Sequence, residues 1–209
     1  MPTRSETAEV LLTLGTATLG ESGGRPMRAR IRAVWPGARM AAPASTVRCT
    51  PGDNLALHVA VARASPGCVL VVDVGIEPEF GYWGEVLTTA AEARGIAGLV
   101  IDGCVRDVAA LEAHRFPVFS TGVALLGATK QLPGSVGGVV QVGQVTIESG
   151  DWVVGDADGV TVVPAAGLEE VVAAGRAREE KEARLFEELR GGATTLDLLG
   201  LDAAPVEGP

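Results

Sequence analysis

The feature that most constrains the fold is a regular alternation of apolar runs and helical patterns between residues 68 and 120. Three apolar runs have the composition of buried strands: residues 68–73 (CVLVVD), 97–102 (AGLVID) and 117–120 (PVFS). Helical patterns at 85–94 and 107–114 separate these runs, and Gly95 suits the end of the first helix. Strand–helix–strand units of this spacing form parallel pairs with right-handed crossovers. The sequence therefore predicts an α/β fold built on parallel βαβ units.

The segments on the N-terminal side of these units predict further elements. Residues 1–25 are small and polar and predict a short helix and a loop, whereas the alternation in 28–34 (RARIRAV) predicts an outer strand. Residues 55–64 (LALHVAVARA) predict a helix with a broad apolar face. The turn at 51–54 leads into that helix and ends in residues that are favoured at helix N-caps.

The C-terminal side predicts antiparallel strands and one long helix. From Gly137 onward, glycine-punctuated alternation predicts hairpins, and Asp158-Gly159 is a strong signal for a tight turn. The DADG segment that contains this turn also begins like a calcium-binding loop, but it lacks the later ligands, so the hairpin is the better interpretation. Residues 165–190 predict a long charged helix that projects toward another subunit, and residues 191–209 predict a loose tail.

Composition and charge set further limits. A chain of 209 residues suits one buried core, so a single domain over residues 1–209 is expected. The net charge of −9 argues against binding to nucleic acids and to anionic membranes, because both attract basic proteins. Three widely spaced cysteines suit a reducing compartment, and no apolar run approaches the ~18 residues of a membrane span. Together with an N-terminus unlike a signal peptide, these features predict a cytoplasmic protein.

Charged residues gather where two of the predicted parallel strands end. Glu85 begins the helix after the first strand, and Arg106 and Asp107 follow the second. The carboxyl ends of parallel strands meet at one edge of a sheet, so we expect these three side chains to lie together. Two carboxylates can hold Mg²⁺ or Mn²⁺, and an arginine beside them can stabilise an enolate. The alternative is a surface Arg–Asp pair, with Glu85 simply favourable at a helix N-terminus.

Other catalytic classes fit the sequence poorly. The chain has only two lysines, Lys130 and Lys181, and neither lies in an apolar run that would bury a Schiff-base lysine. With only His58 and His114, a histidine-rich zinc site is not expected, and both histidines are predicted to be structural. Cys104 lies next to the predicted site, but without a histidine to activate it we expect a small buried thiol.

Several of these motifs resemble a known family. They are Trp83-Gly84-Glu85, Pro51-Gly52-Asp53-Asn54, the run 98–107 (GLVIDGCVRD) and the segment 150–164. They are similar to the ribonuclease E activity regulator-like proteins, which include the class II 4-hydroxy-4-methyl-2-oxoglutarate / 4-carboxy-4-hydroxy-2-oxoadipate aldolases. The resemblance extends over most of the chain and implies a compact αββα sandwich, similar to the swivelling phosphohistidine-type domain. It also implies assembly as a homotrimer or as a hexamer of two trimers.

The resemblance implies roles for the predicted site. The aldolases carry an acidic residue, twenty intervening residues and then Arg-Asp, and Glu85, Arg106 and Asp107 have this spacing. Asp107 would bind the divalent metal, Mg²⁺ or Mn²⁺, and Glu85 would contact it through water. Arg106 would bind the keto-acid oxygens and stabilise the pyruvate enolate. Glu85 stands where the aldolases usually have aspartate, and the extra methylene suits a water-mediated contact.

Further residues enter the site only through the resemblance. Backbone amides near Gly84, Val86 and Leu87 would receive the substrate carboxylate. Glu21 and Glu182 are the nearest matches to acidic residues that the family supplies from a neighbouring subunit.

The sequence leads to two functional hypotheses. The first is a metal-dependent class II aldolase that cleaves a 4-hydroxy-2-oxo dicarboxylic acid to pyruvate and a second keto acid. Oxaloacetate decarboxylation would be a side activity, because it passes through the same enolate. The second is a non-catalytic regulator that binds an RNA-degrading enzyme through its acidic surface. A methyltransferase, the third activity associated with such proteins, would need a glycine-rich cofactor loop that the sequence lacks.

Overall fold

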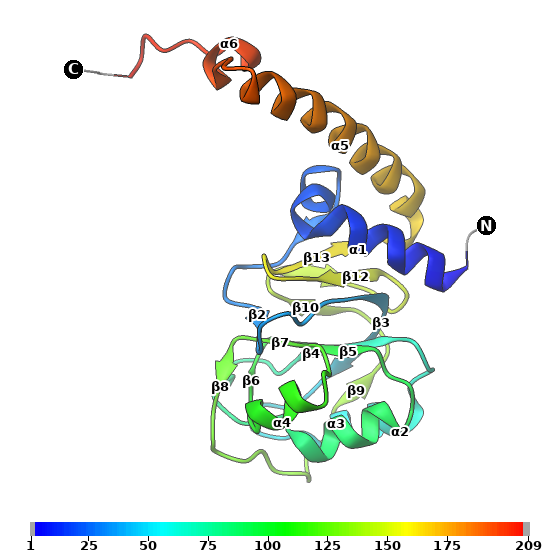
Figure 1. The fold of residues 1–209 in the computed structure, drawn as a ribbon. Helices are drawn as coiled ribbons and strands as arrows, with labels where there is room; N and C mark the ends of the chain where they lie inside the picture. Colours follow the sequence, from blue (N-terminus) through cyan, green and yellow to red (C-terminus); the bar gives the residue numbers. More distant parts are fainter. Residues whose placement is uncertain (1–2, 207–209) are drawn as a thin grey trace.

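Six α-helices and thirteen strands form the described part of the chain, residues 3–206 of a computed structural model (Figure 1). The helices are α1 (Arg4–Glu21), α2 (Leu55–Arg63), α3 (Glu85–Glu92), α4 (Val108–Ala113), α5 (Leu168–Arg190) and α6 (Thr195–Leu199). The strands are β1 (Arg25–Pro26), β2 (Arg32–Ala33), β3 (Met40–Arg48), β4 (Val69–Asp73), β5 (Gly98–Ile101), β6 (Cys104–Val105), β7 (Val118–Ser120), β8 (Gly122–Val123), β9 (Ser135–Val136), β10 (Val140–Val142), β11 (Val145–Ile147), β12 (Trp152–Gly155) and β13 (Val160–Val163). No helix within residues 3–206 is both long and apolar enough to cross a membrane.

A nine-stranded mixed sheet organises the molecule. Its strands follow the order β1-β13-β12-β3-β4-β5-β7-β2, and β9 pairs with β3 outside this path. The pairs β3–β4, β4–β5 and β5–β7 are parallel, and α2, α3 and α4 connect them in turn. The pairs that involve β12, β13, β1 and β2 are antiparallel. These pairings confirm the predicted α/β fold, with parallel βαβ units and a C-terminal antiparallel portion.

Strand β3 joins the parallel and antiparallel halves of the sheet. Its residues 40–43 pair antiparallel with β12, and residues 44–48 pair in parallel with β4. Because one strand belongs to both halves, the sheet curls into two β layers. Helices α2, α3 and α4 cover one outer face, and α1 covers the other, with the start of α5 packed against α1 (Figure 1). The layers are those of the predicted αββα sandwich.

Two apolar cores fill the space between these layers. The larger includes residues of α2–α4, of the parallel strands and of the antiparallel strands β10–β13, and its β4 valines are completely buried. Phe119 on β7 is also fully buried, and Gly155 on β12 leaves it room, because a Cβ at Gly155 would lie 2.6 Å from Phe119 Cζ. The smaller core lies under α1 and α5 and includes Leu11, Leu14 and Trp152.

The N-terminal quarter differs from the sequence prediction. Strand β3 was not anticipated, because residues 40–48 (MAAPASTVR) are mostly small and lack a valine run. The outer strand expected over 28–34 shrinks to β2, since a turn closed by the bond from Ile31 N to Arg28 O uses the first half of that segment. Strand β2 nevertheless lies at the edge of the sheet, beside β7.

Helix α1 is longer than the short helix that the sequence predicts for residues 1–25. It spans 18 residues with a kink at Gly15, whose φ is 74°. The Asp156 carboxylate supports the kink, because it accepts bonds from the backbone N (2.8 Å) and hydroxyl (2.6 Å) of Thr16. Asp156 belongs to the β12–β13 turn, which Asp156 N closes by donating to Gly159 O. The hairpin interpretation of this segment is therefore confirmed.

The C-terminal helix has the extent that its charge pattern predicts. A 3-10 turn at Ala165–Gly167 leads directly into α5, which projects beyond the sheet (Figure 1). Among its 23 residues, Val171 and Gly175 are buried, both near the body of the molecule. The tail differs from the prediction, because Thr194 caps the short helix α6 with its hydroxyl.

Candidate active site

The structure brings Glu85, Arg106 and Asp107 together. Glu85 is the first residue of α3, and Asp107 is the N-cap residue of α4. The backbone N of Glu85 donates to Asp107 Oδ2 at 3.0 Å, and Arg106 Nε lies 3.8 Å from the same oxygen. The three side chains stay open to solvent, with exposed fractions of 59%, 45% and 41%. They therefore form an accessible polar cluster where the segments that follow β4 and β5 meet.

A buried aromatic residue anchors this junction. The Trp83 indole nitrogen donates to Thr88 Oγ1 at 2.7 Å, and its ring stacks on Phe116 with centroids 6.0 Å apart. The carbonyl oxygen of Trp83 accepts a bond from Arg106 N at 2.8 Å. Because Trp83 is 1% exposed, these contacts tie the start of α3 to the segment that carries Arg106.

Asp107 has an unusual backbone conformation. Its φ of 58° and ψ of 38° lie in the left-handed region, which residues other than glycine seldom occupy. The carbonyl oxygen of Asp107 accepts bonds from Ala110 N (2.9 Å) and Leu111 N (3.1 Å), so the first turn of α4 holds this conformation. Backbone strain of this kind is concentrated at functional sites in proteins.

Glycines surround Arg106 and Asp107. A Cβ at Gly84 would overlap Asp107 Oδ2, and one at Gly81 would lie 3.0 Å from Arg106 Cδ. A Cβ at Gly127 would lie 3.4 Å from Arg106 Nη1. The backbone therefore approaches both side chains closely, and larger residues at Gly81 or Gly84 would displace them.

The first turn of α3 offers backbone donors beside this cluster. The first helical bond runs from Thr88 N to Gly84 O at 3.1 Å. Within residues 3–206, no acceptor contacts the backbone N–H of Val86 or Leu87. Free N–H groups at a helix N-terminus favour a bound anion such as a carboxylate. Gly84, Val86 and Leu87 lie at this N-terminus, and their binding of a substrate carboxylate stays a prediction.

His114 is a neighbour of the site that the sequence did not identify. It is the C-cap residue of α4, and its Nε2 lies 3.8 Å from Glu85 Oε1. Its Nδ1 lies 2.7 Å from Glu92 Oε2. The sequence predicted only a structural histidine near a helix end, because the packing of α4 beside α3 leaves no signal in either helix alone.

The other two residues that the sequence assigned to structural roles are enclosed by the fold. Cys104 is 8% exposed, and its Sγ lies 4.0 Å from Thr121 Oγ1. His58 lies on α2 with its Nε2 buried and without a partner among the described residues. Burial lowers the pKa of His58, so its neutral form is favoured.

The donor set is suited to a hard divalent cation. Asp107 Oδ2 is used by Glu85 N, whereas Oδ1 has no partner within residues 3–206, and the Glu85 carboxylate is exposed beside it. No group of three or more His, Cys, Asp or Glu side chains in the described part of the chain could hold a metal. Mg²⁺ commonly binds through one or two carboxylates and keeps several waters, so the two carboxylates present fit it.

Glu21 and Glu182 lie in another part of the chain. Both carboxylates pair with Arg178, and Glu182 Oε1 lies 2.8 Å from Arg178 Nε. They belong to α1 and α5, on the opposite side of the sheet from α3 and α4 (Figure 1). Their contribution to the site of a neighbouring subunit stays a prediction.

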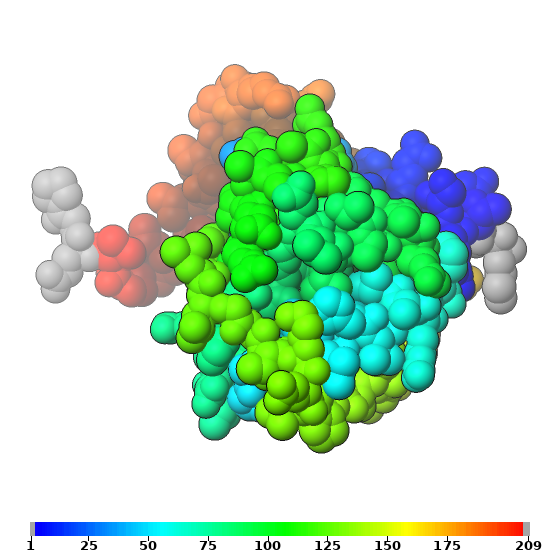
Figure 2. All heavy atoms as spheres, turned by 90° about the horizontal axis from the view of Figure 1, so that it is seen from below, coloured from blue at the N-terminus to red at the C-terminus, as the bar shows by residue number. Residues whose placement is uncertain are grey.

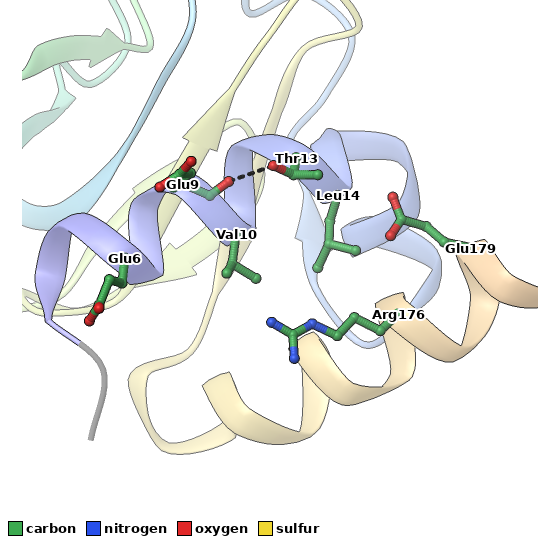
Figure 3. Close-up of a pocket in the computed structure, with 7 residues that line it drawn as sticks. All are labelled: Glu6, Glu9, Val10, Thr13, Leu14, Arg176 and Glu179. Atoms are coloured by element: carbon green, nitrogen blue, oxygen red, sulfur yellow. Dashed lines mark hydrogen bonds between the residues drawn. The ribbon is translucent and has the colours of Figure 1, made fainter.

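A hollow of about 350 Å³ lies between α1 and α5 (Figure 3). The Arg176 guanidinium points into it, between carboxylates and apolar side chains (Figure 3). Its lining residues are Glu6, Glu9, Val10, Thr13, Leu14, Arg176 and Glu179. None of them belongs to the predicted site, so this hollow is separate from the acid–arginine cluster.

The fold and the site together define the class of protein. It is an αββα protein with a curled mixed sheet and an acid–arginine cluster at the N-termini of two neighbouring helices. The chain belongs to the RraA-like family, described as Aldolase/RraA, whose pattern matches residues 10–162. The family resemblance that the sequence motifs indicated is thus confirmed.

Relatives of this chain carry different names. A Halalkalibacterium halodurans protein, provisionally named 4-hydroxy-4-methyl-2-oxoglutarate aldolase, is 39% identical over 143 residues, which are 68% of each chain. The structure of an uncharacterized protein from Pseudomonas syringae pv. tomato str. DC3000 has a TM-score of 0.82 and 30% identity, covering 93% of this chain and 92% of that one. The RNA-processing inhibitor RraA from Thermus thermophilis has a TM-score of 0.65 and 25% identity, covering 71% of this chain and 92% of that one.

Proposed function

We propose that this chain is a divalent-metal-dependent class II aldolase. It would cleave a 4-hydroxy-2-oxo dicarboxylic acid of the 4-hydroxy-4-methyl-2-oxoglutarate type to pyruvate and a second keto acid. The observation that carries the proposal is the convergence of Asp107, Glu85 and Arg106, with one Asp107 oxygen joining all three. The aldolase name of the 39% identical relative supports the same reaction class.

In the proposed reaction, the substrate is first bound and its C3–C4 bond is then cleaved. The amides of Val86 and Leu87 receive the substrate carboxylate, and the Arg106 guanidinium binds the 2-keto oxygen. The C4 hydroxyl loses its proton and becomes the carbonyl of the second keto acid, while the electrons of the C3–C4 bond move to C3. The pyruvate enolate then takes a proton at C3.

The charged side chains of the site would stabilise the negative charge that develops on the 2-keto oxygen. A Mg²⁺ or Mn²⁺ ion held by Asp107, and by Glu85 through water, would polarise the 2-keto oxygen as a Lewis acid. Arg106 stabilises the same oxygen as the enolate forms. Glu85 keeps a water molecule near the C4 hydroxyl, and the proton of that hydroxyl leaves toward this water. Oxaloacetate would lose CO₂ at this site, because that loss produces the same enolate.

The test is pyruvate release from oxaloacetate and from 4-hydroxy-4-methyl-2-oxoglutarate, with Mg²⁺ or Mn²⁺ and with EDTA. We expect metal-dependent turnover whose kcat falls about 10²–10³-fold in Arg106→Ala, the usual cost of losing one oxyanion-stabilising donor. Asp107→Ala should abolish the metal-dependent turnover. Arg63→Ala removes an exposed arginine from α2 and should behave as wild type. Absence of turnover of both compounds by the folded protein would refute the proposal.

The proposal includes a homotrimer or a hexamer. Val123, Leu125 and Leu126 are exposed apolar residues in the segment that follows β7, and Leu126 O accepts a bond from Gly81 N beside Arg106. Figure 2 looks onto this face, where the segment after β8 meets α2, α3 and α4. Covering these side chains in an assembly would bring a neighbouring subunit close to the site. Light scattering of the purified protein measures the assembly.

A second function is favoured by one similarity. The Thermus thermophilis relative is titled an RNA-processing inhibitor, and this chain is strongly acidic. The alternative is therefore a regulator that binds an RNA-degrading enzyme through a basic region of that enzyme. Such binding should need no metal and should survive Asp107→Ala in a pull-down experiment, which separates it from the aldolase.

A further inference from the structure

His114 lies between two carboxylates of α3. Its Nδ1 is 2.7 Å from Glu92 Oε2, which is a hydrogen bond, and its Nε2 is 3.8 Å from Glu85 Oε1. Glu85 and Glu92 are seven residues apart, so both project from the same face of the helix after two turns. The histidine on α4 thus contacts both acidic side chains on this face of α3.

The Glu92 contact fixes the orientation of the imidazole ring. A histidine whose one nitrogen bonds to a carboxylate has a defined ring plane, and its other nitrogen then points in a defined direction. In His114 that other nitrogen faces Glu85. Only 27% of the His114 side chain is exposed, which further restricts the ring.

The contact with Glu85 depends on the length of the glutamate side chain. An aspartate at position 85 would be shorter by one methylene, roughly 1.5 Å, and its carboxylate would lie well beyond contact with His114 Nε2. A glutamate also has one more rotatable bond than an aspartate, so ordering its carboxylate costs more conformational entropy. A neighbouring group that already restricts the glutamate lowers this cost when a ligand binds.

We propose that His114 is a positioning residue for Glu85. It holds the Glu85 carboxylate on the α4 side of the site, next to Asp107. The inference rests on the proposed function, because only there does Glu85 contact the metal through water. Its consequence is that Mn²⁺ affinity depends on His114 when residue 85 is glutamate, and much less when it is aspartate.

The experiment measures Mn²⁺ binding to the full-length protein without substrate, from the electron paramagnetic resonance signal of free Mn²⁺. Four proteins form a cycle: wild type, His114→Ala, Glu85→Asp and the double variant. We expect His114→Ala to weaken Mn²⁺ binding about tenfold, the lower end of the effect of losing a supporting partner. In the Glu85→Asp background, the same substitution should change the affinity by less than about twofold.

Two further variants separate positioning from folding. Glu92→Gln keeps an acceptor for His114 Nδ1 and should retain most of the affinity, whereas Glu92→Ala should lower it. Glu112→Gln is the control. It changes an exposed carboxylate on α4, the helix that ends at His114, and should have no effect. Thermal unfolding identifies any variant that fails to fold.

The outcomes distinguish this inference from the proposed function. If wild type binds no Mn²⁺, both are refuted. If wild type binds Mn²⁺ and His114→Ala leaves the affinity unchanged, the inference alone is refuted. Equal losses in the glutamate and aspartate backgrounds would also refute it, because they would show a general structural role for His114.

Discussion

The side chain of Asp53 should be the largest single electrostatic contribution to stability near the candidate site. It is 1% exposed and precedes α2. Its Oδ2 accepts bonds from Thr129 Oγ1 (2.7 Å), Gln131 N (2.6 Å) and Leu132 N (3.1 Å). Its Oδ1 accepts one from Leu55 N at 2.8 Å. The carboxylate thus joins α2 to the loop that continues from Gly127, beside Arg106.

The pKa of Asp53 gives the magnitude. Burial raises it, but the hydrogen bonds from Gln131, Thr129, Leu55 and Leu132 together outweigh burial and lower the pKa from 3.8 to about 2. That difference, at about 1.36 kcal/mol per pKa unit, corresponds to about 2 kcal/mol of folding stability at neutral pH. Because the folded pKa is the lower one, this stability is present above pH 3.8 and is lost as the pH falls through about 2.

The perturbation is Asp53→Asn. An asparagine has the same shape, but one of its two terminal atoms is an NH₂ donor that would face at least one of the four donors. We therefore expect the free energy of unfolding at pH 7 to fall by about 3 kcal/mol, from the lost charge and an unpaired donor. The part of this difference that comes from the charge should shrink by about half at pH 3, because the unfolded wild-type chain takes up a proton there while the folded carboxylate, with its lower pKa, stays mostly ionised.

Urea unfolding of both proteins between pH 7 and pH 3 measures this effect. Asp158→Asn is the matched control, because Asp158 is exposed and should change stability by less than about 0.5 kcal/mol. A loss below about 1 kcal/mol at pH 7 in Asp53→Asn would refute the reasoning, which assigns an unmet-donor cost of about 1–3 kcal/mol. So would a difference from wild type that stays constant down to pH 3.

Two further predictions concern close packing. Gly84→Ala should weaken Mn²⁺ binding by more than about tenfold, because the added Cβ would displace the Asp107 carboxylate. Gly167→Ala, which has open space around the added Cβ, should leave the affinity unchanged. Titration of free Mn²⁺ compares the two variants, and equal affinities would contradict the close approach of Gly84 to Asp107. Phe119→Ala should lower the free energy of unfolding by about 3–5 kcal/mol, because it leaves a cavity against Gly155. Urea unfolding measures this loss, and a value below about 1 kcal/mol would show that the core collapses to fill the space.

The sequence by itself determined the βαβ series and the location of the acid–arginine cluster. Strands β4, β5 and β7 are buried on both faces, so their apolar runs are visible without any knowledge of their partners. Glu85, Arg106 and Asp107 follow two such strands, and the geometry of parallel sheets brings them to one edge. These inferences need only local pattern and a general rule of topology.

Only the tertiary structure decided the features that depend on distant partners. Strand β3 has small residues in place of an apolar run, and its conformation comes from pairing with β12 on one side and β4 on the other. The contact of His114 with Glu85 arises from the packing of α4 beside α3. Asp53 is held by residues more than seventy positions away in the chain. Such contacts are set by the relative placement of whole elements, which no local periodicity encodes.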